Sequence, residues 1–151
     1  MALPSVLAGP LTVPVVASPM FIYSGPELVA AQCQAGVIGS FPALNARPQS
    51  ALAEWIEQVR ESNEAFAAAN PDRYVAPFAV NQIVHRSNDR LEQDLATVVE
   101  HEVPIVITSL GAAAEVRASA ATATPDPEGE PPVLPKLIWY GASGDFSEAV
   151  I

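Results

Sequence analysis

The sequence is poor in cysteine and in positive charge, and both shortages exclude functions. Cys33 is the only cysteine among the 151 residues, so the chain has no internal disulfide and no cysteine-based metal cluster. Lysine and arginine together number seven against 17 acidic residues, which gives a formal net charge of −10. A chain with so little concentrated positive charge is a poor partner for nucleic acid or for an anionic membrane surface.

Long apolar runs are lacking as well. No stretch reaches the roughly 18 apolar residues of a membrane helix, because prolines and polar residues interrupt each run. The first 20 residues contain neither lysine nor arginine, so the positive region of a secretory signal peptide is missing. We therefore expect a soluble, cytoplasmic protein without a membrane partner.

What the sequence does contain is an alternation of short apolar runs with amphipathic segments. Runs that suit strands buried on both faces of a parallel sheet occur at 13–17, 37–41, within 74–81 and at 104–109. Helices are predicted between them, from about Ser24 to Ala35, from Leu52 to Ala69 and from Ser87 to about His101, and Ser24 is predicted to cap the first. The order β-α-β-α-β-α-β predicts right-handed crossovers and a parallel α/β sheet.

The chain changes character after Gly111. Residues 112–124 are mostly alanine, threonine and serine, and several prolines follow closely. Such a segment favours neither a helix nor a central strand, so we predict that residues 118–135 are disordered. The apolar cluster Leu137–Tyr140 could dock on an exposed sheet edge or on an apolar face.

Ligands of parallel α/β folds bind at the carboxyl ends of the strands. The residues that leave the four predicted strands offer amides, hydroxyls, a thioether and one imidazole, but no nucleophile–base pair and no metal triad. This set suits a flat heteroaromatic cofactor held by backbone groups and side-chain amides. The segments are Ser18-Pro19-Met20, Phe41-Pro42-Ala43, Asn81–His85 and Ser109-Leu110-Gly111.

Three segments closely resemble the first half of bacterial nitronate monooxygenases: VVASPMFIYSGPELVAAQCQAGVIGSFPALNAR, APFAVNQIVHRSNDRLEQDL and VPIVITSLGA. The match runs in order from about Leu11 to Ala112. The resemblance implies a (β/α)8 TIM barrel that binds FMN and oxidises alkyl nitronates with O2 to a carbonyl compound and nitrite. Because such a barrel typically needs about 250 residues, we expect a partial barrel of about four β/α units over 1–112. A divergent, disordered, proline-rich tail is expected over 113–151.

The resemblance also assigns individual residues. Ser18, Pro19 and Met20 would line the flavin, and Asn81 would hydrogen-bond the edge of its ring system. Ser109 and Gly111 would lie nearby. The catalytic histidine of the family follows the fourth strand, in a segment without a counterpart here. No catalytic residue is therefore assigned, and we expect the chain alone to be an inactive fragment that retains FMN poorly.

Alternative interpretations stay open at this point. His85 is a weak catalytic candidate and is more simply a loop histidine, while Asn81 could be a turn-forming residue. The chain could be a non-catalytic half-barrel, a remnant or an assembly piece that self-associates through open sheet edges. It could also serve another FMN barrel reaction such as enoyl-thioester reduction, because fold alone does not fix chemistry.

Overall fold

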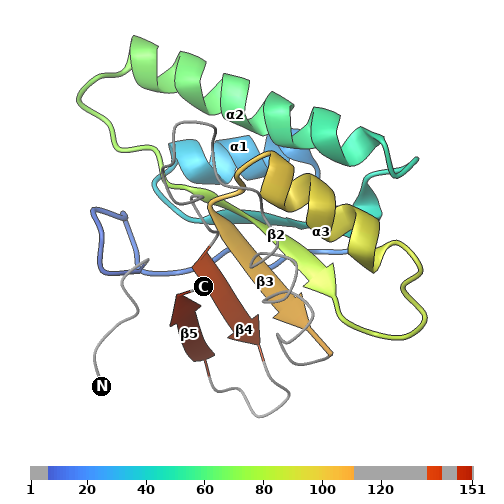
Figure 1. The fold of residues 1–151 in the computed structure, drawn as a ribbon. Coiled ribbons are helices and arrows are strands. Elements are labelled where there is room, and N and C mark those ends of the chain that lie inside the picture. Colours follow the sequence, from blue (N-terminus) through green and yellow to red (C-terminus); the bar gives the residue numbers. More distant parts are fainter. Residues whose placement is uncertain (1–6, 111–135, 141–145, 151) are drawn as a thin grey trace, which may run out of the picture.

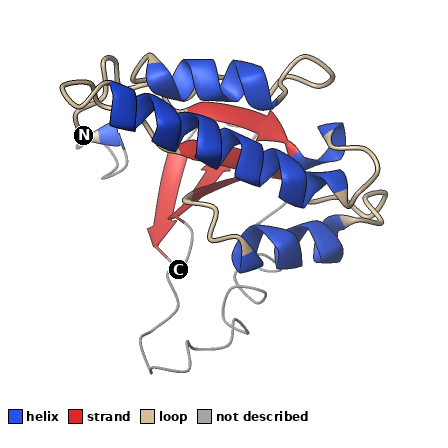
Figure 2. Ribbon diagram, turned by 90° about the horizontal axis from the view of Figure 1, so that it is seen from above, coloured by secondary structure: helices blue, strands red, loops and turns tan. Residues whose placement is uncertain are grey.

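The computed structural model describes residues 7–110, 136–140 and 146–150, which form one sheet with three helices on one of its faces (Figures 1 and 2). The strands lie in the order β1-β2-β3-β4-β5 across the sheet. None of the helices in these ranges is long and apolar enough to cross a membrane. The strands are β1 Gly39–Pro42, β2 Phe78–Ile83, β3 Ile105–Ser109, β4 Lys136–Tyr140 and β5 Phe146–Val150.

β1, β2 and β3 are parallel to one another and correspond to the last three predicted strands. Asn81 in β2 pairs with Pro42 in β1 and with Ile107 in β3. β2 begins later than the window 74–81 predicts and ends at Ile83. Pro77 precedes the strand and has no N–H for the ladder, so regular pairing starts at Phe78. Asn81 therefore lies within the strand and not after it.

The first predicted strand, residues 13–17, is reduced to a single bridge. Val16 pairs with Ile38 in parallel, and the Ala17 N–H donates to the Ile38 carbonyl at 2.8 Å. Pro14 lacks one of the N–H groups that a longer ladder would use, which accounts for the short pairing. The segment nevertheless runs beside β1, where the sequence predicts it.

The helices are α1 Pro26–Gln34, α2 Ala51–Ala69 and α3 Leu91–Glu100, which confirms the three predicted helical regions. Gly36 has a φ of 79°, the left-handed conformation expected of a helix stop. The predicted cap at Ser24 is wrong, because Gly25 is the N-cap and no side chain bonds there. The Ser24 hydroxyl oxygen instead accepts the Met20 N–H at 2.9 Å, so a loop bond replaces the cap.

The two faces of the sheet pack differently, because successive side chains of a strand alternate between them. On the helix-covered face, Phe41, Phe78, Val80 and Val106 join one core with apolar residues of all three helices. The opposite face carries a smaller buried cluster, against which the N-terminal segment packs. That cluster consists of Ile38, Ala76, Ala79, Ile105 and Ile107, with Leu7, Leu11 and Val16 laid against it.

α1 lies so close to β1 that only glycine fits at position 39. A Cβ built on Gly39 would lie 2.6 Å from the Val29 carbonyl oxygen and 3.1 Å from the Cys33 sulfur. The Cys33 thiol is fully buried at this contact, and its burial raises its pKa. Cys33 therefore acts as a small apolar packing residue in its protonated form.

Part of the predicted disordered tail is ordered. Lys136–Tyr140 pairs with β3 in parallel, and Phe146–Val150 pairs with β4 antiparallel. The irregular tail expected over 113–151 therefore does not extend to these two segments, and Leu137–Tyr140 docks on a sheet edge, one of the two alternatives that the sequence left open. β3 would otherwise leave an unpaired row of backbone groups, and the apolar run Leu137–Tyr140 occupies that edge. Residues 118–135 lie outside the described residues.

Candidate functional site

A cavity of about 680 Å³ lies against the sheet face that the helices do not cover. Its volume falls within the roughly 300–1,000 Å³ typical of small-molecule sites. Its wall is mainly apolar and carries three polar side chains, a composition that such sites share. The lining residues are Leu7, Pro14, Val15, Val16, Ala17, Ser18, Pro19, Asn81, Ile107 and Ser109.

Asn81 and Ser109 form a hydrogen-bonded pair in the cavity wall. The Ser109 hydroxyl donates to Asn81 Oδ1 at 2.7 Å. Their strands are adjacent, with Asn81 opposite Ile107 and Ile83 opposite Ser109, so both side chains share one sheet face. Asn81 is only 6% exposed, and among the described residues its Nδ2 makes no hydrogen bond. A mostly buried amide with an unused donor is suited to bind a ligand acceptor.

Ser40 fixes the part of the wall that precedes Ser18. This serine of β1 is fully buried, and its hydroxyl donates to the Ala17 carbonyl. Since the Ala17 N–H is bonded to the Ile38 carbonyl, both backbone polar groups of Ala17 are held by the edge of the sheet. Ser18 and Pro19 follow directly from this anchored position. The one sequence signal for this anchoring role was a serine within the otherwise apolar run Val37–Phe41.

The structure brings four of the six predicted flavin-lining residues together: Ser18, Pro19, Asn81 and Ser109 all line the cavity. Met20 adjoins Pro19 but is not among the lining residues, and it is 42% exposed. Gly111 lies outside the described residues. The predicted positions therefore converge on one cavity, with Met20 at its margin.

Strand alternation separates the residues of the predicted segment Asn81–His85. Gln82 lies opposite Thr108 on the helix-covered face, and both are fully buried. Among the described residues, neither the Gln82 amide nor the Thr108 hydroxyl has a hydrogen-bond partner. Only Asn81 of this segment lines the cavity.

His85 is an exposed loop residue outside the cavity wall. Its Nδ1 lies 2.8 Å from the Ser87 hydroxyl and accepts the Ser87 N–H at 3.2 Å. This supports the interpretation as a loop histidine.

Asn81 bonds to a residue of a neighbouring strand and not to its own backbone, so the turn-forming alternative is not observed. Within the described part of the chain, no cluster of acidic, histidine or cysteine side chains could hold a metal ion.

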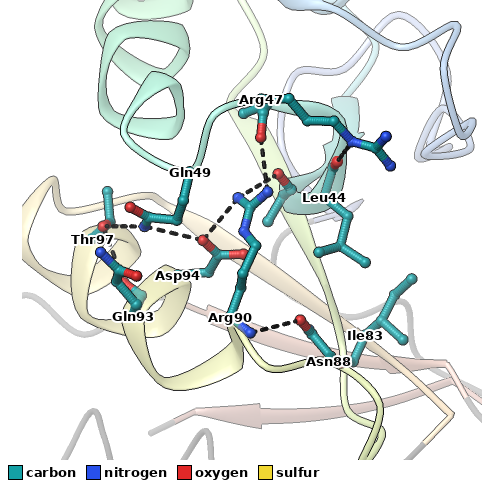
Figure 3. Close-up of polar contacts among 11 residues, drawn as sticks. Leu44, Arg47, Gln49, Ile83, Asn88, Arg90, Gln93, Asp94 and Thr97 are labelled. Atoms are coloured by element: carbon teal, nitrogen blue, oxygen red, sulfur yellow. Dashed lines mark hydrogen bonds and ion pairs between the residues drawn. The ribbon is translucent and has the colours of Figure 1, made fainter.

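A buried polar network, which sequence reasoning missed, joins the turn after β1 to α3 (Figure 3). The Arg90 guanidinium donates to the carbonyls of Ala43 and Ala46, at 3.3 and 2.9 Å, and to Asp94 Oδ1 at 3.0 Å. Gln49 Nε2 donates to the same Asp94 oxygen at 3.1 Å. Asp94 is fully buried. The one sequence signal was the four-residue spacing of Arg90 and Asp94, which suits an ion pair on a helix.

No family model and no curated protein matches the sequence. Among solved structures, a mutant of FabK from Thermotoga maritima is similar in fold, with a TM-score of 0.61 and 20% sequence identity. The similarity covers 89% of this chain and 37% of the FabK chain, so the present chain spans little more than a third of that structure. The fold is α/β and corresponds to part of a TIM barrel, which confirms the predicted fold class.

Proposed function

We propose that this chain carries part of an FMN-dependent barrel oxidoreductase of the nitronate monooxygenase type. Such an enzyme oxidises alkyl nitronates with molecular oxygen to a carbonyl compound and nitrite. The partial-barrel fold supports the general class. The specific reaction rests on the segments around Ser18 and Asn81 that resemble this family. A cytoplasmic location belongs to the same proposal.

The observation that carries the proposal is the Asn81–Ser109 pair in the wall of an apolar cavity. The cavity volume suits a planar ring system, and the wall combines apolar surface with few polar groups. The donor set is uncharged, which fits the edge of a neutral heteroaromatic ring. The residues present therefore fit a flavin ring.

Each wall residue then has a defined task. Asn81 Nδ2 donates to an acceptor on the ring edge, while the Ser109 hydroxyl holds Asn81 Oδ1 and so fixes which way the amide faces. Backbone groups of Ser18 and Pro19 contact the ring, and the apolar wall excludes water. Met20 and Gly111 belong to the same proposed set. A bound flavin supplies the redox chemistry, accepting electrons from the substrate and passing them to oxygen.

We assign these residues to cofactor binding and not to proton transfer. The described lining contains no titratable side chain, so nothing in it serves as a general base. His85 lies outside the lining, and its ring nitrogen is already bonded to Ser87. We therefore expect this chain to bind FMN weakly and reversibly and to form no nitrite by itself.

Titration of the purified chain with FMN, followed by flavin fluorescence and the visible spectrum, tests this proposal. Saturable quenching is expected, and propane-2-nitronate should then perturb the bound-flavin spectrum without nitrite formation. An absence of saturable binding contradicts the assignment of the cavity. Nitrite formation with oxygen uptake contradicts the assignment of these residues to binding alone.

A second candidate is another FMN barrel reaction such as enoyl-thioester reduction, because the fold similarity to FabK does not select one reaction over another. An enoyl thioester would then perturb the spectrum of the FMN-loaded chain where propane-2-nitronate does not.

Self-association through free sheet edges is our proposal for a protein partner. Sedimentation velocity over a range of concentrations tests it, and a monomer throughout would contradict it.

A further inference from the structure

The loop after Pro19 is exposed, apolar and strained. Phe21, Ile22 and Tyr23 are 55%, 75% and 78% exposed. Ile22 has a φ of 71°, a left-handed conformation that is unfavourable for a β-branched residue. Strained backbone of this kind persists only where surrounding contacts impose it. The contacts that hold the loop therefore need to be identified.

Asn45 supplies most of these contacts from the short turn Ala43–Asn45 that follows β1. Its Oδ1 accepts the Ile22 N–H at 3.0 Å. Its Nδ2 donates to the Met20 carbonyl at 3.0 Å and to the Ser24 carbonyl at 2.9 Å. One side chain thus bonds three backbone groups of the loop, on both sides of the strained residue.

Arg47, just after the same turn, makes a further contact with the loop, and the turn is itself anchored. The Arg47 guanidinium lies 5.6 Å from the centre of the Phe21 ring, a cation–π geometry. Arg90 bonds the carbonyls of Ala43 and Ala46, on either side of Asn45, and its position is fixed by buried Asp94 (Figure 3). The loop is therefore connected through the turn to α3.

We propose that Asn45 is a positioning residue of the candidate site. It holds residues 20–24 in their strained conformation and thereby fixes the adjoining wall at Ser18 and Pro19. The identity of the bound ring rests on the proposed function, whereas the positioning of the loop does not. Arg90 acts one step further away, through the turn.

The test is amide hydrogen exchange in the full chain carrying Asn45→Ala. The informative group is the Ser24 N–H, which bonds the Met20 carbonyl at 3.0 Å and is not among the three backbone groups that bond Asn45. We expect its exchange to accelerate about tenfold or more, because the loop opens once its three bonds are lost. The Ala17 N–H, bonded to the Ile38 carbonyl, should keep its wild-type rate.

The matched control is Gln34→Ala, which removes the bonds from Gln34 Nε2 to the Ser62 carbonyl and hydroxyl between α1 and α2. It should leave the Ser24 rate unchanged. An unchanged Ser24 rate in Asn45→Ala overturns the proposal. Equal acceleration at Ser24 and Ala17 also overturns it, since Asn45 would then contribute only to general stability.

FMN titration of the same variants provides a second measurement. The dissociation constant should rise about tenfold in Asn45→Ala and stay unchanged in Gln34→Ala, because a loosened wall must be ordered on binding. If the wild-type chain does not bind FMN, the proposed function fails, while the exchange rates still decide whether Asn45 positions the loop. Selective loosening of the loop with unchanged FMN affinity would overturn its role in the site.

Discussion

The two faces of the central sheet differ in how completely they are packed. On the helix-covered face, β1–β3 and the three helices share one continuous core that includes Leu52, Ile56, Val59, Leu95 and Val98. On the other face, within the described residues, five buried residues pack against the N-terminal segment, and a cavity of about 680 Å³ lies beside them. The same strands thus contribute to the main core on one side and to the candidate site on the other.

The contrast extends to the polar residues of each face. On the helix-covered side, Arg90 and Asp94 bond each other and Arg90 also bonds backbone carbonyls, while Gln82 and Thr108 are buried without a partner among the described residues and do not line the cavity. On the cavity side, Asn81 keeps an unused donor among the described residues. Polar groups that are consumed in bonding stabilise the fold, whereas a group with spare capacity in a cavity wall is available to a ligand.

The largest effect that should sharpen this contrast is the loss of Arg90. Arg90→Met leaves the fully buried Asp94 without its cation and removes the Arg90 bonds to two backbone carbonyls, of which, among the described residues, only Ala43 keeps another donor, the Ala46 N–H. We expect the free energy of unfolding to fall by about 3–5 kcal/mol, measured by urea denaturation. The double variant Arg90→Met with Asp94→Leu should recover part of this loss. If the double variant is no more stable than Arg90→Met, the unpaired Asp94 carboxylate is not the cause of the lost stability.

A smaller effect separates the two apolar clusters directly. Ile56 is fully buried in the helix-side core, while Ile107 is 6% exposed and lines the cavity. Ile56→Ala loses transfer free energy and opens a new void, so we expect a cost of about 4 kcal/mol. Ile107→Ala only enlarges an existing cavity and should cost about 2 kcal/mol. Equal losses in urea denaturation would break the distinction between the faces.

The smallest predicted effect lies on the outer surface of α2. Glu57 accepts from His101 Nδ1 at 2.7 Å and pairs with Arg60, and the His101 bond, followed by the charge of Arg60, holds the Glu57 pKa below its ordinary value. Because the folded-state pKa is lowered, this stabilisation is present above about pH 4.5 and is lost as the pH falls through the lowered value.

Glu57→Gln should therefore flatten the loss of stability in that acidic window. At neutral pH the change should stay below about 1 kcal/mol, because the pair is partly exposed and screened by solvent. Urea midpoints of wild type and variant between pH 7 and pH 3 check this. A variant curve parallel to that of the wild type over the whole range would refute the linkage.

Much of the fold could be predicted because it depends on local patterns. The spacing of Leu52, Ile56 and Val59 predicts the buried face of α2, and short apolar runs predict β1 and β3. One expectation failed where a local rule met a competing contact, because Ser24 bonds Met20 instead of capping α1. The sequence left two docking modes open for Leu137–Tyr140, since it does not locate the strand edge with which this run pairs.

The candidate site could be predicted in part. The carboxyl ends of parallel strands marked the segments that contain Asn81 and Ser109, and the family resemblance singled out these two residues. Ser40, Asn45 and Arg90 were missed, because their roles depend on which loops meet in space. Their side-chain bonds to the backbone link positions 21–47 residues apart, and no local period marks such contacts.

The most direct measurement is the FMN affinity of two variants with substitutions at neighbouring positions of β2. Asn81→Leu removes the amide that faces the cavity, while Gln82→Leu makes the same change on the opposite face of β2. We predict that Asn81→Leu raises the dissociation constant for FMN at least about tenfold. The bound ring would lose a hydrogen bond, and its acceptor atom would be buried without a donor. Gln82→Leu should bind FMN as the wild type does. Equal affinities in both variants and the wild type would contradict the assignment of this cavity to a flavin.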